Sequence, residues 1–476
     1  MLTHSCSRTP ARLRRGQRGQ GLIEYAIILA LIALLVIAIM NVLGKNVQSS
    51  LCQASTGLTG QSASGCTIWG SGSNFYGELG LGWTGNGGAT PQQSSGGPVG
   101  PIMATASGTF MTVALKYDGT VWTWGANGFG ELGNGASCGA TYPSECLGSN
   151  VPVQVSGLSS VVAVGATAIT GYAVKSDGSV WSWGGNAYGE LGNDTQSVCG
   201  AGLPTVPNCQ GSTSPVQVCA VGVVVANCGG SYLSGVKAIS SGGAYSVLAL
   251  KSDGTIVAWG SGGAGQLGNG LGTNSLVPVN VTMSGSFTSA TAVAAGSYFG
   301  MAIATGGNVF TWGDDGENEL GTGEAVCSPD PCDKHSAPVQ VSTISNITAI
   351  SGGRLHAMAL SSSGTLYGWG DNFYGELGTA PCTPQPCGAS TPTTIPGVSQ
   401  VVAISAGSYY SLVATSGGQA WGCGRDDWGQ LGNGSINSVS PYNVDPMTQV
   451  LKVKNVVLVQ ATWLSSEFIT RGLNGQ

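Results

Sequence analysis

Short stretches of alternating apolar and polar residues recur from residue 66 to the end of the chain. Many form pairs joined at an Asp-Gly dipeptide, as in 110–125, 172–184 and 246–260. A period of two predicts half-buried strands, and Asp-Gly between two strands predicts a hairpin with a primed turn. A further β-branched stretch precedes each hairpin, as in 401–407. The pattern therefore predicts units of three to four strands.

Each hairpin runs into a glycine-anchored motif whose clearest form is WGxNxxGELG. The seven copies occupy 72–80, 124–133, 183–192, 259–268, 312–321, 369–378 and 424–432. Their anchoring glycines are 53 to 76 residues apart, a period typical of a propeller or repeat array. The final stretch, 456–475, matches only the first half of a unit, and 66–80 supplies the missing second half. We therefore predict an all-β, seven-bladed propeller whose last blade is completed by the N-terminal strand, which removes exposed edges.

The repeats resemble the regulator of chromosome condensation repeat family, whose members are seven-bladed β-propellers closed by a split blade. The resemblance covers roughly residues 62–476 and rests on recurring GxxxSxAL, DGxVxxWG and GxLGNG elements. Two units carry Ser71 and Cys423 where the other five have a tryptophan, expected to pack between blades. Those tryptophans are Trp124, Trp183, Trp259, Trp312 and Trp369.

Five units place an aromatic residue immediately before the GELG or GQLG of the motif. These residues are Tyr76, Phe129, Tyr188, Tyr374 and Trp428. Because they share one position of an inter-strand loop, we expect them to ring one face of the disk. They are candidates for a binding face, with local loop packing as the alternative.

Composition supports a folded, turn-dense body: 80 glycines and 8% charged residues accompany 42% hydrophobic content. Five arginines lie in the first nineteen residues with no acid, and beyond them 11 basic residues face 22 acidic ones. An acidic body with scattered bases carries no electrostatic footprint for nucleic acid, so none is expected as a partner.

Most of the 14 cysteines form close pairs inside Pro-, Gly- and Ser-rich loops. We expect disulfides that staple these loops, which implies export to an oxidising compartment. The candidate pairs are Cys138 with Cys146, Cys199 with Cys209, Cys219 with Cys228, Cys327 with Cys332, Cys382 with Cys387, and Cys52 with Cys66. Zinc is disfavoured because the spacings are not those of zinc knuckles and the chain has three histidines.

No catalytic set emerges from the repeats, so we predict neither an enzyme nor a cofactor. Neither His335 nor His356 accompanies a nucleophile motif. The acidic stretch 314–319 offers oxygen ligands for Ca²⁺, but a solvated variant of the repeat loop is the favoured interpretation and no metal site is predicted.

A second pattern stands alone at the other end, where 22–43 is almost continuously apolar except for Glu24, Tyr25 and Asn41. A helix of this length spans about 33 Å, enough to cross a bilayer, and the preceding arginines predict a cytoplasmic N-terminus. A cleaved signal would need a small-residue site after the run, which is weak here. A plain anchor leaves the carboxylate of Glu24 unexplained.

The stretch RGQGLIEYAIILALIALLVIA resembles the N-terminus of tight-adherence (Flp) pilins of the type IV pilin superfamily. The resemblance implies cleavage by a prepilin peptidase between Gly19 and Gln20. It also implies that Glu24, followed by Tyr25, pairs with the N-terminal amine of a neighbouring pilin subunit during assembly. Such pairing would give the carboxylate the counter-charge it needs.

These inferences divide the chain into a basic leader (1–19), a hydrophobic pilin or transmembrane helix (20–46), a linker (47–64) and the propeller (65–476). We expect a pilin-like surface subunit that displays the propeller for adhesion or for binding a protein or other surface ligand. It would lie in a bacterial inner membrane before assembly, with the propeller extracytoplasmic, and at the cell surface or in a pilus afterwards. The alternative is a membrane-tethered binding or inhibitor module that never polymerises.

Overall fold

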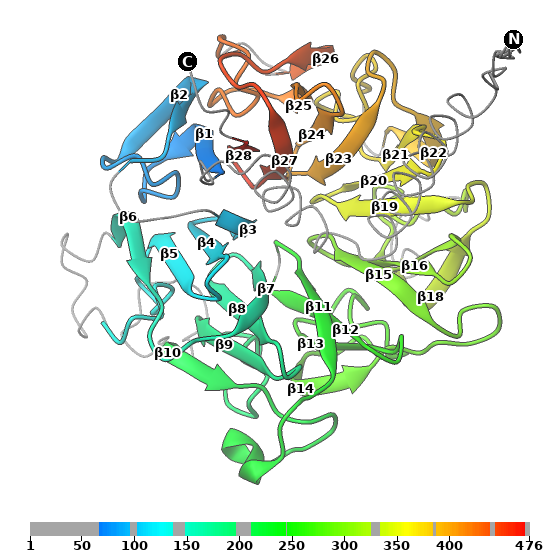
Figure 1. Cartoon of the computed structure of the whole chain (residues 1–476). Helices are drawn as coiled ribbons and strands as arrows, with labels where there is room; N and C mark the ends of the chain where they lie inside the picture. Colours follow the sequence, from blue (N-terminus) through cyan, green and yellow to red (C-terminus); the bar gives the residue numbers. More distant parts are fainter. Residues whose placement is uncertain are drawn as a thin grey trace, which may run out of the picture.

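The strands of the chain form a ring of blades around one axis (Figure 1). The computed structural model describes residues 66–95, 102–136, 148–196, 211–243, 245–324, 334–383, 387–437 and 443–471. In these ranges 28 strands form seven four-stranded antiparallel sheets, which confirms the predicted seven-bladed propeller. The leader, helix and linker predicted over 1–64, with Gly19, Gln20, Glu24 and Tyr25, lie outside the described residues. Within the described ranges, no helix has the length and apolar character needed to cross a membrane.

Each blade runs from an inner first strand to an outer fourth strand. The first strands are β3 (Ile102–Ser107), β7 (Val161–Ala166), β11 (Val236–Ser241), β15 (Ala290–Ala295), β19 (Ile347–Gly352), β23 (Val401–Ala406) and β27 (Val456–Ala461). The second strands are β4 (Met111–Lys116), β8 (Thr170–Lys175), β12 (Ser246–Lys251), β16 (Phe299–Ala304), β20 (His356–Ser361), β24 (Tyr410–Thr415) and β28 (Ser465–Thr470). First strands of neighbouring blades contact one another around the axis (Figure 1).

The outer half of each blade comes from the motif strand and the strand after it. The third strands are β5 (Val121–Gly125), β9 (Val180–Gly184), β13 (Ile256–Gly260), β17 (Val309–Asp314), β21 (Leu366–Gly370), β25 (Ala420–Arg425) and β1 (Thr67–Asn74). The fourth strands are β6 (Ser149–Gln154), β10 (Ser212–Gln217), β14 (Ser275–Asn280), β18 (Lys334–Val341), β22 (Ala389–Thr394), β26 (Asn443–Gln449) and β2 (Gly85–Gln93). A short 3-10 turn, η1 (Ala226–Gly230), lies between β10 and β11. We number the blades 1 to 7 in the order of these lists.

Blade 7 closes the ring in the way that the offset repeats predict. Its strand order is β2-β1-β28-β27, so two strands come from each end of the described chain. In the register between β1 and β28, Thr67 lies opposite Thr470 and their hydroxyl oxygens are 2.8 Å apart. The ring is therefore held shut by a backbone ladder between residues about 400 positions apart.

The hairpins at the Asp-Gly pairs are present, but the predicted primed turns are wrong. In blade 1 the Lys116 N–H donates to Thr120 O (3.0 Å) and the Gly119 N–H donates to Lys116 O (3.0 Å). Gly119 has a φ of +77°, whereas Asp118 is not among the residues with positive φ. This is a three-residue loop with glycine in the left-handed position, one residue longer than the primed turn needs. The Asp118 carboxylate also accepts the Thr120 N–H (3.0 Å), which favours this form.

The five repeat tryptophans are fully buried and lie between blades, as predicted. Each indole N–H donates to the backbone carbonyl of the Glu or Gln in the preceding blade's motif; for example, Trp183 Nε1 donates to Glu131 O at 2.8 Å. Cys423 Sγ and Ser71 Oγ donate to the equivalent carbonyls of Glu376 and Gln430, each at 3.3 Å. The two units that lack the tryptophan therefore keep a donor to the same acceptor.

Candidate functional site

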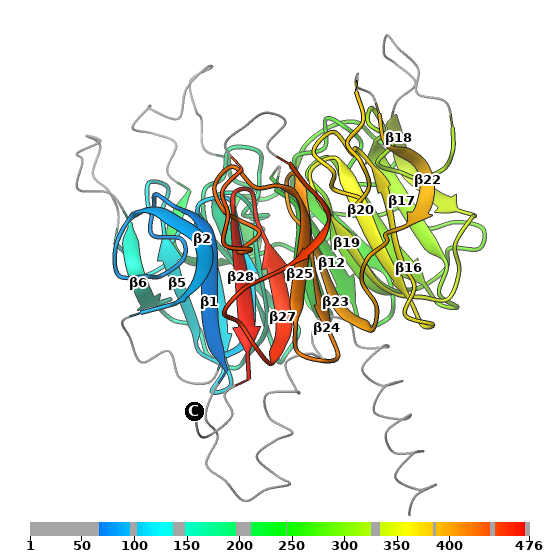
Figure 2. The ribbon, with the colours of Figure 1, turned by 90° about the horizontal axis from the view of Figure 1, so that it is seen from above.

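Antiparallel strands alternate in direction, so the connections of each blade alternate between the two faces of the disk. The connections from first to second strand and from third to fourth strand lie on one side, which we call the loop face. The Asp-Gly turns and the connections between blades lie on the other, which we call the turn face. Figure 2 shows the disk from its edge, with the strands running between these faces.

The third-to-fourth loops have a common scaffold, seen clearly in blade 2. The Leu191 N–H donates to Asn186 Oδ1 (3.0 Å), and the Tyr188 N–H donates to Glu190 Oε2 (2.7 Å). From blade 3, Trp259 Nε1 donates to Glu190 O (2.8 Å). These buried hydrogen bonds hold the loop backbone in place, while the Tyr188 side chain remains 39% exposed. The loop presents a rigidly held aromatic ring to solvent.

The chain enters this loop through a backbone bend at the motif glycine. Gly125 has a φ of +107°, and a Cβ there would lie 2.3 Å from Phe110 O. Both conditions exclude a side chain. The ladder register also shifts between Thr123 and Gly125, which turns the strand toward the loop face.

The glutamates inside these loops are buried, and burial raises their pKa values. The pKa of Glu131 and that of Glu190 rise to about 7, and that of Glu319 rises to about 8. The hydrogen bonds that these carboxylates accept from backbone N–H groups lower the pKa, but by less than burial raises it. In blades 3 and 6 the position is occupied by Gln266 and Gln430, which accept the same backbone N–H.

All five predicted binding-face residues lie in third-to-fourth loops of the loop face. Four of them contact a second aromatic ring, which directly precedes a second strand in three cases and is Phe75, the residue after β1, in the case of Trp428. The centroid distances are 5.1 Å for Tyr76 with Phe110, 5.1 Å for Tyr188 with Tyr245, 5.2 Å for Tyr374 with Tyr409 and 5.2 Å for Trp428 with Phe75. Four of the five predicted residues therefore form aromatic pairs. Whether it binds a partner stays a prediction.

The second member of each pair was not predicted from the sequence. Phe110, Tyr245 and Tyr409 each occupy the residue directly before a second strand, a recurrence visible in the repeats. Trp463 was not predicted either; it is 39% exposed, and its ring centre lies 6.2 Å from that of Phe110. Together with Phe75 (48% exposed) and Tyr76 (42%), it forms an exposed aromatic patch on blade 7, flanked by Trp428 of blade 6 and Phe110 of blade 1.

Two arginines flank Tyr409 next to this patch. The guanidinium carbon of Arg354 lies 5.1 Å from the Tyr409 ring centre and that of Arg425 lies 5.5 Å from it. Arg354 Nη1 also donates to Tyr409 Oη. Arg425 pairs with Asp427 (2.5 Å) and lies 5.4 Å from the Tyr374 ring centre. This Arg–Tyr cluster, Arg354, Tyr374, Tyr409 and Arg425, joins blades 5 and 6.

A cavity of about 90 Å³ opens where the first-to-second connections converge on the axis. Small residues line most of it, including Ser240, Ser351 and Ser405 of the first strands. Arg354 is the charged residue among those lining it, and Trp463 is the aromatic one. The cavity, the Arg–Tyr cluster and the exposed aromatic patch therefore adjoin one another on the loop face.

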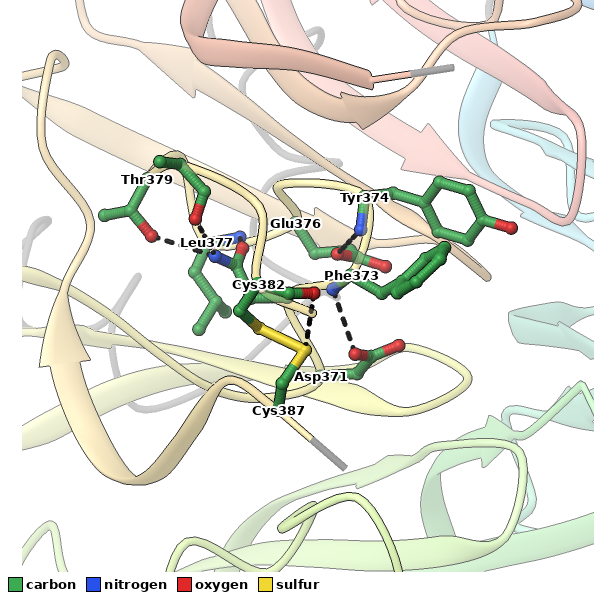
Figure 3. Close-up of a disulfide and its surroundings, with 10 residues drawn as sticks. Asp371, Phe373, Tyr374, Glu376, Leu377, Thr379, Cys382 and Cys387 are labelled. Carbon is green, nitrogen blue, oxygen red and sulfur yellow. Dashed lines mark hydrogen bonds between the residues drawn. A yellow bond between two sulfur atoms is a disulfide. The ribbon is translucent and has the colours of Figure 1, made fainter. Parts of the chain in front are cut away.

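Two predicted disulfides lie within the described residues. Cys382 bonds to Cys387 in the third-to-fourth loop of blade 5, beside the turn that carries Tyr374 (Figure 3). Cys219 bonds to Cys228 near η1. Cys66 is also in a disulfide. The remaining candidates, Cys52, Cys138, Cys146, Cys199, Cys209, Cys327 and Cys332, lie outside the described residues.

His356 forms a contact that the sequence analysis did not anticipate. Its Nε2 lies 3.0 Å from Ser411 Oγ, and burial lowers its pKa to about 3, so it is neutral. Both residues are fully buried, and Ser411 Oγ donates to Glu376 O (2.8 Å). A substrate cannot reach this pair, and its hydrogen bonds serve packing between blades.

Two carboxylates of the acidic stretch 314–319 accept backbone N–H groups of their own loop. Glu319 Oε2 accepts the Glu317 N–H (2.8 Å), and Asp315 Oδ1 accepts the Leu320 N–H (2.8 Å). Across the described ranges, no group of three or more His, Cys, Asp or Glu residues is arranged to hold a metal. The favoured interpretation, a variant of the repeat loop, agrees with these contacts.

Comparison with known proteins agrees with this architecture. The chain is 29% identical over 357 residues to the ultraviolet-B receptor UVR8 of Arabidopsis thaliana, covering 73% of this chain and 70% of the receptor. It is 27% identical over 368 residues to the mitochondrial RCC1 domain-containing protein RUG3 of the same plant, covering 74% and 75% of the two chains. The crystal structure of Prp20p from Saccharomyces cerevisiae superposes with a TM-score of 0.67 at 20% identity, over 87% of this chain and 93% of that one. Residues 48–463 match the model of the RCC1-like domain, and the chain therefore belongs to the RCC1-like domain family.

Proposed function

We propose that the propeller is a non-catalytic protein-binding module and that its partner contacts the loop face. The observation that carries this proposal is the exposed aromatic patch formed by Phe75, Tyr76 and Trp463. Aromatic rings and arginines are enriched at the energetic centres of protein interfaces, and here they adjoin. The fixed loop backbones favour tight binding, because little conformational freedom is lost on association.

The described chain ends support a display role. Thr67 begins β1 and Thr470 ends β28, and both lie at the turn face. A segment that precedes residue 66 would therefore hold the propeller by the face opposite to the aromatic patch. In the finer form of the proposal, this segment is the pilin-like helix, and the subunit presents its loop face outward for adhesion or protein binding.

The relatives support protein binding as the general role. Prp20p is described with binding properties to Gsp1p and histones, and it has been crystallised with Kap60. At about 20% identity these structures show a shared fold, and a shared fold does not identify the partner of this chain. The disulfides Cys219–Cys228 and Cys382–Cys387 support an extracytoplasmic location, since such bonds persist in oxidising compartments.

Site-specific photo-crosslinking tests the binding face. We would place p-benzoylphenylalanine at Tyr188 or Trp463 of the loop face, and at Trp122 or Trp181 as aromatic controls in third strands outside that face, in cells producing the full chain. We expect discrete crosslinked protein products at the first two positions. Crosslinks confined to the control positions would overturn the proposal.

Two measurements test the finer form. Sequencing of the mature N-terminus should begin at Gln20, whereas a start at Met1 or beyond residue 45 would exclude pilin processing. Glu24→Ala should then abolish assembled fibres while leaving a stable, membrane-bound monomer. Unchanged behaviour of Glu24→Ala would favour the alternative of a tethered binding or inhibitor module that does not polymerise.

A further inference from the structure

We propose that the central cavity of the loop face is a carboxylate subsite, which receives an acidic side chain of the protein partner. The proposal rests on the proposed function for the nature of the ligand, but its chemistry follows from the groups that line the cavity. They are a guanidinium and a set of hydroxyls whose oxygens each accept a backbone N–H and whose O–H groups are left to donate.

The hydroxyl groups come from three first strands. Ser240 Oγ accepts the Ala295 N–H (3.1 Å), Ser351 Oγ accepts the Ala406 N–H (3.0 Å) and Ser405 Oγ accepts the Ala461 N–H (2.9 Å). Each bond crosses to the next blade. Among the described residues, none of the three hydroxyls donates to a protein acceptor. Their O–H groups are therefore available to an anion in the cavity that they line.

The positive charge comes from Arg354. It lines the cavity and makes no ion pair with a carboxylate of the described chain, whereas Arg425 is paired with Asp427. The bond to Tyr409 Oη and the contact with the Tyr409 ring hold its guanidinium in place. A guanidinium has five N–H donors, so this bond leaves donors for a carboxylate.

The size and charge of the cavity limit the ligand. A volume of about 90 Å³ suits a carboxylate and its methylene stem, and not a folded domain. The chain beyond its leader is acidic, so an anion is held by local contacts and not by the field of the whole molecule. We infer that the aromatic patch supplies most of the binding free energy and that the cavity selects partners with a suitably placed Asp or Glu.

Calorimetric titration of the full chain tests the subsite directly. The probes are the capped peptide Gly-Glu-Gly, the neutral peptide Gly-Gln-Gly and inorganic phosphate. We expect the Glu peptide to bind more tightly than the Gln peptide, and Arg354→Gln to weaken its binding at least about tenfold. Arg354→Lys should restore part of it, while Lys452→Gln, an exposed cation on the turn face, should leave it unchanged.

Three other outcomes would contradict the subsite or its assignment to carboxylates. Equal binding of the two peptides, or full binding by Arg354→Gln with an unchanged far-ultraviolet spectrum, would overturn the subsite. Binding of phosphate without binding of the Glu peptide would overturn the assignment to carboxylates. The proposed function fails separately, through crosslinks confined to the control positions Trp122 and Trp181, whatever the peptides do.

Discussion

At the residue scale, the buried glutamate of the third-to-fourth loop accepts a backbone N–H from the residue two positions before it. Five blades use glutamate and two use glutamine in this role. A buried glutamate with a pKa of about 7 binds its proton more tightly in the folded state than in the unfolded state, whose ordinary value is 4.5. Its contribution to stability is therefore lost as the pH rises from about 4.5 through 7.

This linkage predicts that Ala126→Ser combined with Glu131→Gln stabilises the protein at alkaline pH. The pair copies blade 3, where Gln266 Nε2 donates to Ser261 Oγ (3.3 Å). We expect a gain of about 2 to 3 kcal/mol in the free energy of unfolding at pH 8 and little change at pH 4, because glutamine does not titrate. Urea denaturation at both pH values measures this. Ala126→Ser alone is the control, and a gain independent of pH would contradict the explanation.

At the element scale, the fourth strands share a feature that the other strands lack. Each contains one proline, namely Pro152, Pro215, Pro278, Pro338, Pro392, Pro446 and Pro91. Proline has no backbone N–H, so it is compatible with an outer strand and interrupts pairing with a further strand. In blade 7 the pairing of β1 with β28 covers the edge of β28, but each blade is a separate sheet whose fourth strand keeps an open outer edge, which the prolines protect.

Replacement of two such prolines should promote association without unfolding the blades. For Pro152→Val combined with Pro215→Val, we expect a melting temperature close to that of the parent and a rise in concentration-dependent oligomers, because two outer strands gain a donor. Sedimentation velocity over a concentration series measures the oligomers. Val153→Thr with Val216→Thr, in the same strands with the prolines kept, should remain monomeric. An unchanged oligomer content in the proline variant would contradict the role assigned to proline.

At the scale of the whole molecule, the split blade brings both described chain ends to the turn face. A tether before residue 66 would therefore make the two faces unequal in accessibility. Blade 2 offers a matched pair of positions, with Tyr188 on the loop face and Asp177 in the Asp-Gly turn of the turn face, both exposed.

On the proposal that a membrane tether precedes residue 66, we predict that a bulky polyethylene glycol maleimide reacts several-fold faster with Tyr188→Cys than with Asp177→Cys in intact cells, since the membrane would then shield the turn face. After extraction in detergent, the two rates should become similar. The unsubstituted chain, whose Cys423 is buried, gives the background. Equal rates in intact cells would show that the propeller is not held by its turn face.

The sequence by itself determined the number of blades, the split closure and the interblade position of the tryptophans. These features follow from local patterns, because period-two alternation and a repeated glycine motif encode each blade independently of the others. The same patterns placed Tyr76, Phe129, Tyr188, Tyr374 and Trp428 on one face. The exact turn type was not recoverable in this way, since Asp-Gly suits both a two-residue and a three-residue loop, and hydrogen bonds such as that of Asp118 choose between them.

Only the tertiary structure decided which side chains these aromatic residues contact. The partner of Tyr374, Tyr409, lies in the next blade, and Arg354 and Arg425 converge on it from blades 5 and 6. The hydroxyls of Ser240, Ser351 and Ser405 meet around the axis because the ring closes. Such groupings depend on the angle between blades and on closure over the whole chain, and no local pattern records either quantity. The closed ring therefore brings residues from separate repeats together around one axis.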